Sequence, residues 1–108
     1  MSLELSKPIA AFFAAQNGQN TEVLAQHFTE GAVVRDEGRT IVGTVAIEEW
    51  RAETKRKYQH TIEPLTSVEK DGETIVTGRV AGNFPGSPVE LQFTFCVESG
   101  RIASLEIH

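Results

Sequence analysis

The stretch AVVRDEGRTIVGTVAIEEW, residues 32–50, decides the fold predicted for this chain. It predicts a short strand that ends at Asp36, a tight turn at 37–38, a second short strand and then an amphipathic helix. Val34 and Asp36 stand two residues apart, so on a strand their side chains point to the same face. A carboxylate on an inward, apolar face has a raised pKa and can act as a general base near neutral pH. Asp36 is therefore the candidate catalytic residue.

The composition predicts one globular domain that spans residues 1–108. Hydrophobic residues make up 40% of the chain and charged residues 23%, which argues against disorder. The net charge of −5 argues against a nucleic-acid partner, since such proteins normally carry a basic patch. The lone cysteine, Cys96, rules out an internal disulfide and offers no metal cluster. The chain has no apolar run of ~20 residues and no signal-peptide layout, so we expect a cytoplasmic protein with no membrane partner.

Three helices are expected before residue 59. The first follows Ser6 as N-cap, carries Pro8 in its first turn and ends near Gly18. A second, short helix is expected at 23–28, capped at residue 20 or 21, with a loop at 29–31. The third begins after Thr44 as N-cap and has an apolar stripe on one face. The residues of this stripe are Ile47, Trp50, Thr54 and Tyr58.

The remainder of the chain reads as an antiparallel meander. Pro64 indicates that the first strand, at 59–69, lies at an edge or contains a bulge. The Asp-Gly pair at 71–72 predicts a hairpin turn. The next strand, at 73–84, contains Gly78 and Gly82, which indicate bulges or close packing. Two final strands are expected at 89–97 and 101–107. Helices that precede a meander predict an α+β fold, with a curved antiparallel sheet wrapped around three N-terminal helices.

Such a cone is expected to hold a central pocket for a small apolar molecule, with no cofactor and no metal. Alternation alone does not decide whether His60, Arg79, Asn83 and Gln92 face it. The aromatic side chains would equally suit a filled core. A cavity of ~300 Å³ or more that reaches Asp36 would favour ligand chemistry. The predicted ligand-binding residues are Phe12, Phe28, Val34, Trp50, Tyr58, His60, Arg79, Phe84, Phe93 and Phe95.

The order of these elements and four motifs resemble the SnoaL-like, nuclear transport factor 2-like superfamily. The motifs are AVVRDEGR at 32–39, G-x-x-A-I-x-x-W at 43–50, GNFPGSPVELQFTF at 82–95 and SGRIASLEI at 99–107. The resemblance covers nearly the whole chain and implies a cystatin-like cone. The superfamily includes ketosteroid isomerases, scytalone dehydratase, limonene-epoxide hydrolases, polyketide cyclases and many non-enzymatic binding modules. The fold by itself therefore does not choose a function.

The resemblance places Asp36 on the proton-shuttling aspartate of the isomerases. The isomerase tyrosine that donates to the oxyanion falls on Phe12, and the second donor, a protonated aspartate, falls on Leu91 or Gln92. None of these side chains matches the acid or phenol of the isomerases. Because preorganised donors supply much of such catalysis, steroid-type isomerisation is not expected.

Two other activities of the superfamily also need residues that this chain lacks. The epoxide hydrolases of the superfamily have one arginine between two aspartates. Arg79 lies on a suitable strand of this chain, but Ala81 stands where a nearby acid would be expected. The second aspartate of the chain, Asp71, belongs to a turn. A dehydratase needs paired pocket histidines, and only His60 is placed near the pocket.

Two functions remain open from the sequence. In the first, Asp36 is the general base of an isomerase-, cyclase- or hydrolase-type enzyme. In the second, the domain is a non-catalytic ligand-binding or dimerisation module, and Asp36 only bonds the amide of Gly38 or Arg39 or pairs with the Arg39 side chain. Under both, a homodimer is expected through the outer sheet face, where 92, 94 and 96 carry little charge.

Overall fold

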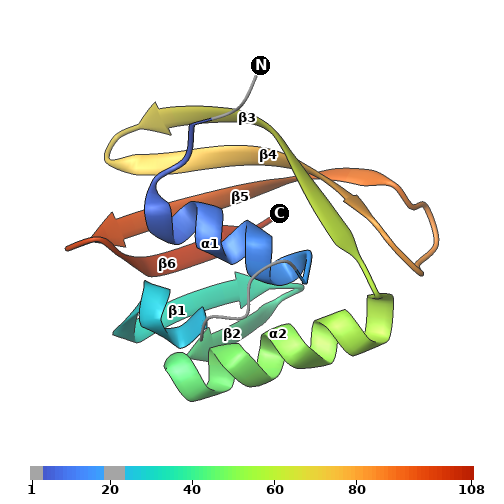
Figure 1. The fold of residues 1–108 in the computed structure, drawn as a ribbon, viewed down its shortest axis with the longest axis horizontal. Coiled ribbons are helices and arrows are strands. Elements are labelled where there is room, and N and C mark those ends of the chain that lie inside the picture. Colours follow the sequence, from blue (N-terminus) through green and yellow to red (C-terminus); the bar gives the residue numbers. More distant parts are fainter. Residues whose placement is uncertain (1–3, 19–23) are drawn as a thin grey trace.

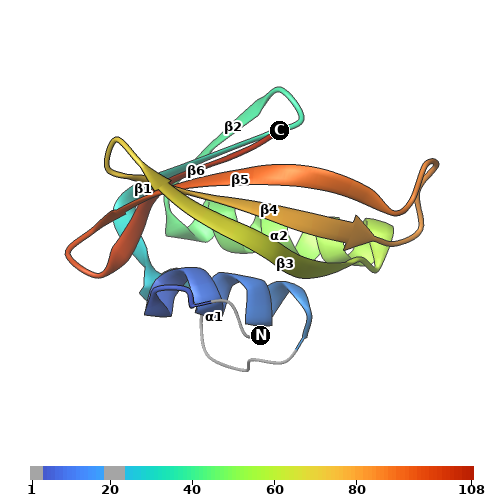
Figure 2. The ribbon, with the colours of Figure 1, turned by 90° about the horizontal axis from the view of Figure 1, so that it is seen from above.

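In the part of the chain that the computed structural model describes, two α-helices pack against one side of a six-stranded sheet (Figures 1 and 2). The structure describes residues 4–18 and 24–108. No helix within these two ranges is long and apolar enough to cross a membrane. In chain order the elements are α1 (Lys7–Gln16), the 3-10 turn η1 (Leu24–His27), β1 (Phe28–Asp36), β2 (Arg39–Val42), α2 (Thr44–Tyr58), β3 (Thr61–Lys70), β4 (Glu73–Ala81), β5 (Val89–Glu98) and β6 (Arg101–Ile107).

The expectation of three helices is wrong for the described part of the chain, which has two. The segment expected to form the second helix contributes a single 3-10 turn, and β1 begins directly after it at Phe28. Residues 29–31, expected as a loop, belong to β1. Phe28 pairs with Ile102 of β6, so sheet pairing overrides the helical spacing at this point. The caps expected at residues 20 and 21 lie outside the described residues.

The sheet is mixed, which corrects the expectation of a wholly antiparallel one. Its strand order is β2-β1-β6-β5-β4-β3, and β1 pairs in parallel with β6, for example Val34 with Leu105. The cause is α2, which carries the chain away from β1 and β2 to the opposite edge at β3 (Figure 1). The antiparallel meander then returns, and its last strand arrives beside β1 in the same direction.

Both predicted tight turns are confirmed. Glu37 and Gly38 join β1 to β2 with φ angles of 52° and 75°, while Asp71 and Gly72 join β3 to β4 with 53° and 80°. Pro64 lies on the edge strand β3 and next to a register shift, as expected. These turns fix the ends of the strands, and the first of them places Asp36 at the last position of β1.

Helix α2 begins at Thr44, and Gly43 occupies the N-cap with φ 91°, so Thr44 is not the cap that its sequence suggests. The predicted stripe is present but is unevenly covered. Ile47 and Trp50 are buried, whereas the side chains further along, Thr54 and Tyr58, are only half-buried. The C-terminal half of α2 therefore borders a space that the core does not fill.

Phe12 of α1 is the centre of the aromatic core. Its ring is fully buried and stacks on that of Trp50 with a centroid distance of 6.5 Å and an interplanar angle of 9°. Its ring also meets Phe95 edge-on at 5.6 Å. The end of α1 is tied to β3 by the Asn17 side chain, which donates to the Ile62 carbonyl oxygen at 2.8 Å and accepts from the Ile62 amide at 2.7 Å. These contacts fix α1 against the strands that line the unfilled space.

Candidate functional site

A cavity of about 440 Å³ lies between the helices and the sheet, and it reaches Asp36. It exceeds the ~300 Å³ at which small-molecule sites begin. Its walls come from α1, α2, the end of β1 and strands β3 to β6. The exposed members of the wall, Glu37, Pro85 and His108, mark its opening to solvent, while buried residues such as Phe12 and Phe93 form its inner part.

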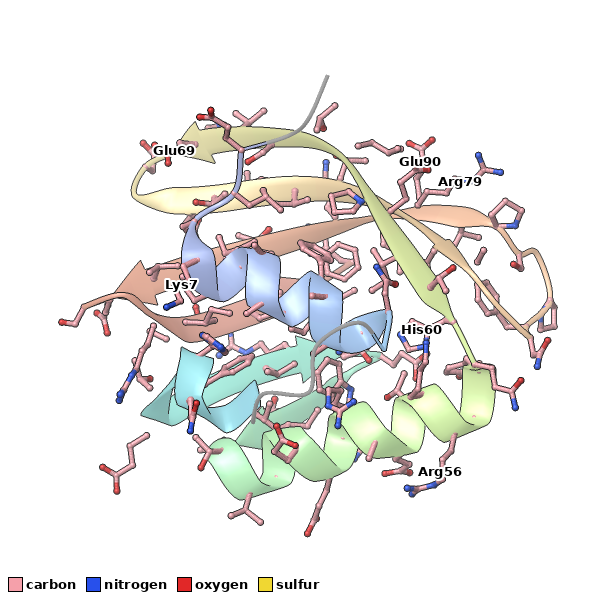
Figure 3. The ribbon with its side chains drawn as sticks, viewed as in Figure 1. Lys7, Arg56, His60, Glu69, Arg79 and Glu90 are labelled. Atoms are coloured by element: carbon pink, nitrogen blue, oxygen red, sulfur yellow. The ribbon has the colours of Figure 1, made fainter. Side chains whose placement is uncertain are left out.

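The structure brings seven of the predicted site residues together around this cavity. Asp36 stands at the end of β1, and His60 follows α2 and points back toward α1 (Figure 3). The seven are Asp36, Phe12, Trp50, Tyr58, His60, Phe84 and Phe93.

Three predicted wall residues are core residues instead. Phe28, Val34 and Phe95 are buried and do not line the cavity. They share the inward face of the sheet and belong to the filled core: the Phe95 ring lies 5.8 Å from that of Phe13, and the Phe28 ring lies 6.4 Å from that of Phe12. The strand period indicates this face but not which of its residues border the cavity.

Arg79 lies outside the cavity, on the exposed face of β4. Its neighbour Val80 is buried and lines the cavity, and alternation along the strand turns Arg79 the opposite way. Its cross-strand partners are Glu63 and Glu90, and Figure 3 shows Arg79 beside Glu90. Asn83 and Gln92 are exposed and are also absent from the wall.

The carboxylate of Asp36 has an indole as its hydrogen-bond partner. Trp50 Nε1 donates to Asp36 Oδ2 at 3.1 Å. Burial raises the pKa of the Asp36 carboxyl above its ordinary value of 3.8, and this effect is larger than the lowering caused by the Trp50 hydrogen bond. The charge of Glu37 raises this pKa further, and that of Arg39 lowers it by less than burial raises it. The side chain is half-buried at the wall of an apolar cavity, as the sequence predicted.

A second polar group lies at the inner part of the cavity, where α1 meets the start of β3. His60 Nε2 and Gln16 Oε1 are 3.0 Å apart. Lys55 Nζ donates to the backbone oxygen of Gln16 at 2.8 Å and also to the backbone oxygen of His60. Burial lowers the pKa of the His60 imidazole, and the nearby charge of Lys55 lowers it further. His60 is therefore a neutral side chain at pH 7.

Tyr58 and Glu37 stand near the opening of the cavity. The Tyr58 hydroxyl donates to Glu37 Oε1 at 3.4 Å, and the Tyr58 ring packs edge-on against Phe84 at 5.8 Å. This contact joins the end of α2 to the turn after β1. Within residues 4–18 and 24–108, no three His, Cys, Asp or Glu side chains gather in a way that could hold a metal ion.

Several wall residues were missed by sequence reasoning, and most carried a usable signal. Gln16 stands one helical turn after Phe12, so the 3.6-residue period places both on one face. The strand residues obey the period of two: Leu91 and Phe93 share a face of β5, and Ile107 pairs with Phe93 across to β6. The other residues missed in this way are Thr54, Ile62, Val80 and Val89.

The comparisons with known proteins extend over almost the whole domain. The family model described as a SnoaL-like domain matches residues 9–105. A solved structure of a proposed polyketide cyclase from Sinorhizobium meliloti is 38% identical, with a TM-score of 0.91 over 96% of this chain and 95% of that one. No curated protein matches the sequence.

More distant structures share the fold. A protein of ketosteroid isomerase-like fold from Catenulispora acidiphila, solved with trimethylamine, is 18% identical, with a TM-score of 0.79 over 94% of this chain and 84% of that one. A cystatin-fold protein from Novosphingobium aromaticivorans is 16% identical, with a TM-score of 0.77 over 97% and 99% of the two chains. The predicted cystatin-like architecture is thereby confirmed.

Proposed function

The chain belongs to the SnoaL-like domain family, and we propose that its cavity binds a small, largely apolar carbonyl compound from which Asp36 removes a proton. The observation that carries the proposal is the place of Asp36. Its carboxylate faces an apolar cavity, and its hydrogen-bond partner is the neutral indole of Trp50. A carboxylate held in this way is a stronger base than one in water, because burial raises its pKa.

The proposed step is proton abstraction from the carbon next to the carbonyl group. The Asp36 carboxylate takes the proton and becomes a neutral acid, while the electron pair of the broken C–H bond moves to give an enolate. If a C=C bond adjoins the α-carbon, the electron pair spreads over it, and return of the proton from Asp36 to the far carbon of that bond completes an isomerisation. Alternatively, the enolate carbon attacks a second carbonyl group and closes a ring, and Asp36 returns its proton to the alkoxide that forms. The 38%-identical protein from Sinorhizobium meliloti, a proposed polyketide cyclase, supports the second outcome.

The position of Arg79 counts against hydrolysis of epoxides. That chemistry needs an arginine next to the acid that activates water, and Arg79 is on the exposed face of β4. The acid and the arginine are thus separated by the sheet. Proton abstraction from carbon requires no arginine. It requires a base and a site that holds the substrate, and the place of Asp36 on the cavity wall supports both.

A second candidate function is ligand binding without chemistry. It is favoured by the residues at the oxyanion-donor positions of the isomerases, which the resemblance places on Phe12 and on Leu91 or Gln92. Phe12 and Leu91 line the cavity but cannot donate a hydrogen bond to a developing negative charge, and Gln92 is exposed and outside the wall. In this case the same cavity would hold the same class of molecule, and Asp36 would bind it without transferring a proton.

Exchange of α-protons separates the two functions. The wild-type protein in D2O is mixed with 2-decalone, and loss of the α-proton signals is followed by NMR. We expect Asp36→Asn to lower the protein-catalysed rate about 100-fold or more, which is typical when a general base is removed. Asp71→Asn, which alters the other aspartate in an exposed turn, is the control. Equal rates for wild type and Asp36→Asn would remove the catalytic proposal.

Binding is measured in the same samples through Trp50, the only tryptophan of the chain and a wall residue. A change in its fluorescence on addition of 2-decalone, without proton exchange above the rate in buffer, would select the non-catalytic function. The absence of both signals would contradict both functions.

A further inference from the structure

Gln16 and His60 form a buried polar pair on a wall that is otherwise mostly apolar. Their exposed fractions are 2% and 5%, and both line the cavity. The pair comes from two elements, the last turn of α1 and the residue before β3, and Lys55 holds the two backbones together through their carbonyl oxygens. These bonds hold both residues in place on the wall, and Figure 3 shows His60 between the end of α2 and α1.

The hydrogen-bonding capacity of this pair is not used up. Gln16 Nε2 and His60 Nδ1 are both buried, and neither has a hydrogen-bond partner among the residues that the structure describes. A neutral imidazole has one donor and one acceptor nitrogen. If His60 Nε2 donates to Gln16 Oε1, an acceptor remains on His60 and donors remain on the Gln16 amide. If the amide is turned over, its N–H group donates to His60 Nε2, which leaves a donor on His60 and an acceptor on Gln16.

In both arrangements, one residue of the pair keeps a free hydrogen-bond donor and the other keeps a free acceptor. A buried polar group without a partner destabilises the free protein, so a ligand that satisfies both the donor and the acceptor gains affinity. A hydroxyl group is the smallest group that accepts and donates at one atom. A ketone oxygen only accepts, and a carboxylate brings a charge that the neutral pair does not balance. Lys55 is occupied by the two backbone oxygens, so its ammonium group is not aimed at a ligand.

From this geometry we infer that Gln16 and His60 anchor a hydroxyl group of the ligand. The inference rests on the proposed function and narrows it: the ligand is a neutral, compact, apolar molecule with a hydroxyl group at one end. The anchor lies at the inner part of the cavity and Asp36 at another point of the same wall. A bound hydroxy ketone can then place its carbonyl end toward Asp36 while its hydroxyl group is held by the pair.

The test compares decahydro-2-naphthol with its methyl ether. The two probes have nearly the same apolar surface, but only the alcohol both donates and accepts. Binding is followed by Trp50 fluorescence. We expect wild type to bind the alcohol about 3- to 10-fold more tightly than the ether, the ratio that corresponds to one net hydrogen bond. In Gln16→Met and His60→Leu this preference should fall to about 1, while affinity for the ether changes little.

Gln26→Met is the matched control, because Gln26 is exposed and lies outside the cavity wall. It should keep the preference of wild type. A preference that survives in Gln16→Met and His60→Leu would overturn the anchor. Failure of wild type to bind either probe would overturn the cavity function and the anchor together. A wild-type preference that both variants lose, without any α-proton exchange of 2-decalone, would leave the anchor standing and remove only the catalytic proposal.

A second measurement needs no variant and so does not depend on folding of the mutants. In wild-type protein labelled with 15N-histidine, the alcohol should shift the imidazole nitrogen signals of His60, and the ether should shift them much less. Equal shifts for the two probes would contradict a hydrogen bond between the hydroxyl group and the pair.

Discussion

The indole Nε1 of Trp50 donates a hydrogen bond to Asp36 Oδ2 at 3.1 Å, and this contact joins the middle of α2 to the last residue of β1. The two residues are 14 positions apart in the chain and are connected by the β1–β2 hairpin and the first turns of α2. Trp50 itself is fixed by stacking on Phe12. The orientation of the carboxylate thus depends on the aromatic core as well as on the strand that carries it.

Asp36→Asn is expected to make stability less dependent on pH. Burial raises the folded-state pKa of Asp36 above 3.8, so the unfolded chain ionises first as pH rises. Wild type therefore loses stability between 3.8 and the raised folded pKa, and the loss stays constant above it. The asparagine variant lacks this loss, and its side-chain oxygen still accepts from Trp50.

Urea unfolding from pH 3 to 8 tests this expectation. The stability of Asp36→Asn relative to wild type should increase from pH 3 upward and then level off, with the variant at least as stable at pH 7. If Asp36 were a structural cap instead, the variant would be about 1 kcal/mol less stable at pH 7.

Trp50→Phe should raise the pKa of the Asp36 carboxyl further. The indole N–H group stabilises the ionised carboxylate, and phenylalanine keeps an aromatic ring at the site but cannot donate. The carboxyl 13C signal of Asp36 followed against pH measures the change directly. Tyr58→Phe removes a hydroxyl group whose partner is Glu37, so it should shift this titration much less. An unchanged or lowered pKa in Trp50→Phe would show that the hydrogen bond does not act on the charged form.

The fold was predictable where turns and alternation carry the signal. The Glu37–Gly38 and Asp71–Gly72 turns and the edge position of Pro64 follow from local backbone preferences. The parallel pairing of β1 with β6 did not follow, because it brings together residues such as Phe28 and Ile102 that lie far apart in the sequence. Local periodicity contains no information about such a partner. For the same reason, it predicts a helix at 23–28, where the structure has a single 3-10 turn followed by β1.

For the candidate site, the sequence predicts which face of each strand or helix points inward. It does not predict which of the inward residues border the cavity and which belong to the filled core. Strand alternation predicts that Asp36 shares the inward face of β1 with Val34, and the helical stripe predicts that Trp50 and Tyr58 face the sheet. Of these four residues, all except Val34 line the cavity. Phe95 lies on the same face of β5 as Phe93, and both rings contact Phe13 of α1, yet only Phe93 meets the cavity. Alternation indicates the face of a strand and does not indicate which residues on that face border a cavity. The hydrogen bond from Trp50 to Asp36 depends on the crossing of α2 over β1, which no local pattern describes.

The pH dependence of stability expected from His60 has the opposite sign to that expected from Asp36. Burial and Lys55 lower its folded-state pKa below 6.5, so the unfolded chain takes up a proton first as pH falls. Stability present above pH 6.5 is therefore lost as pH falls from 6.5 to the lowered folded pKa. His60→Gln should lack this loss, and urea unfolding at pH 7.5 and pH 5 measures it. If the difference in unfolding free energy between wild type and His60→Gln were the same at both pH values, the imidazole would not be buried in its neutral form.

The outer face of the sheet is proposed as a dimer interface. Thr94 lies between Ile75 and Glu106 in the strand register, and Ile75 pairs in turn with Val68, an exposed hydrophobic residue. Light scattering should give twice the 11.8 kDa of one chain. Thr94→Arg should yield monomers, because a buried charge without a partner is costly. Glu53→Arg, on exposed α2 surface, is the control. Monomeric wild type across micromolar concentrations would rule the dimer out.

Gly82→Ala tests the packing that supports the wall of the site. A Cβ at this position would stand 2.7 Å from the Tyr58 carbonyl oxygen and 3.0 Å from His60 Cα, and both are backbone atoms that cannot rotate away. Overpacking of this kind costs about 1–3 kcal/mol. Relief of the clash would also move Tyr58 and His60, so binding of decahydro-2-naphthol should weaken. Gly31→Ala is the control, since its Cβ meets nothing within 4 Å, and its unfolding free energy should stay within about 0.5 kcal/mol of wild type. If urea unfolding found equal losses for both alanine variants, the close contact at Gly82 would not be what requires glycine there.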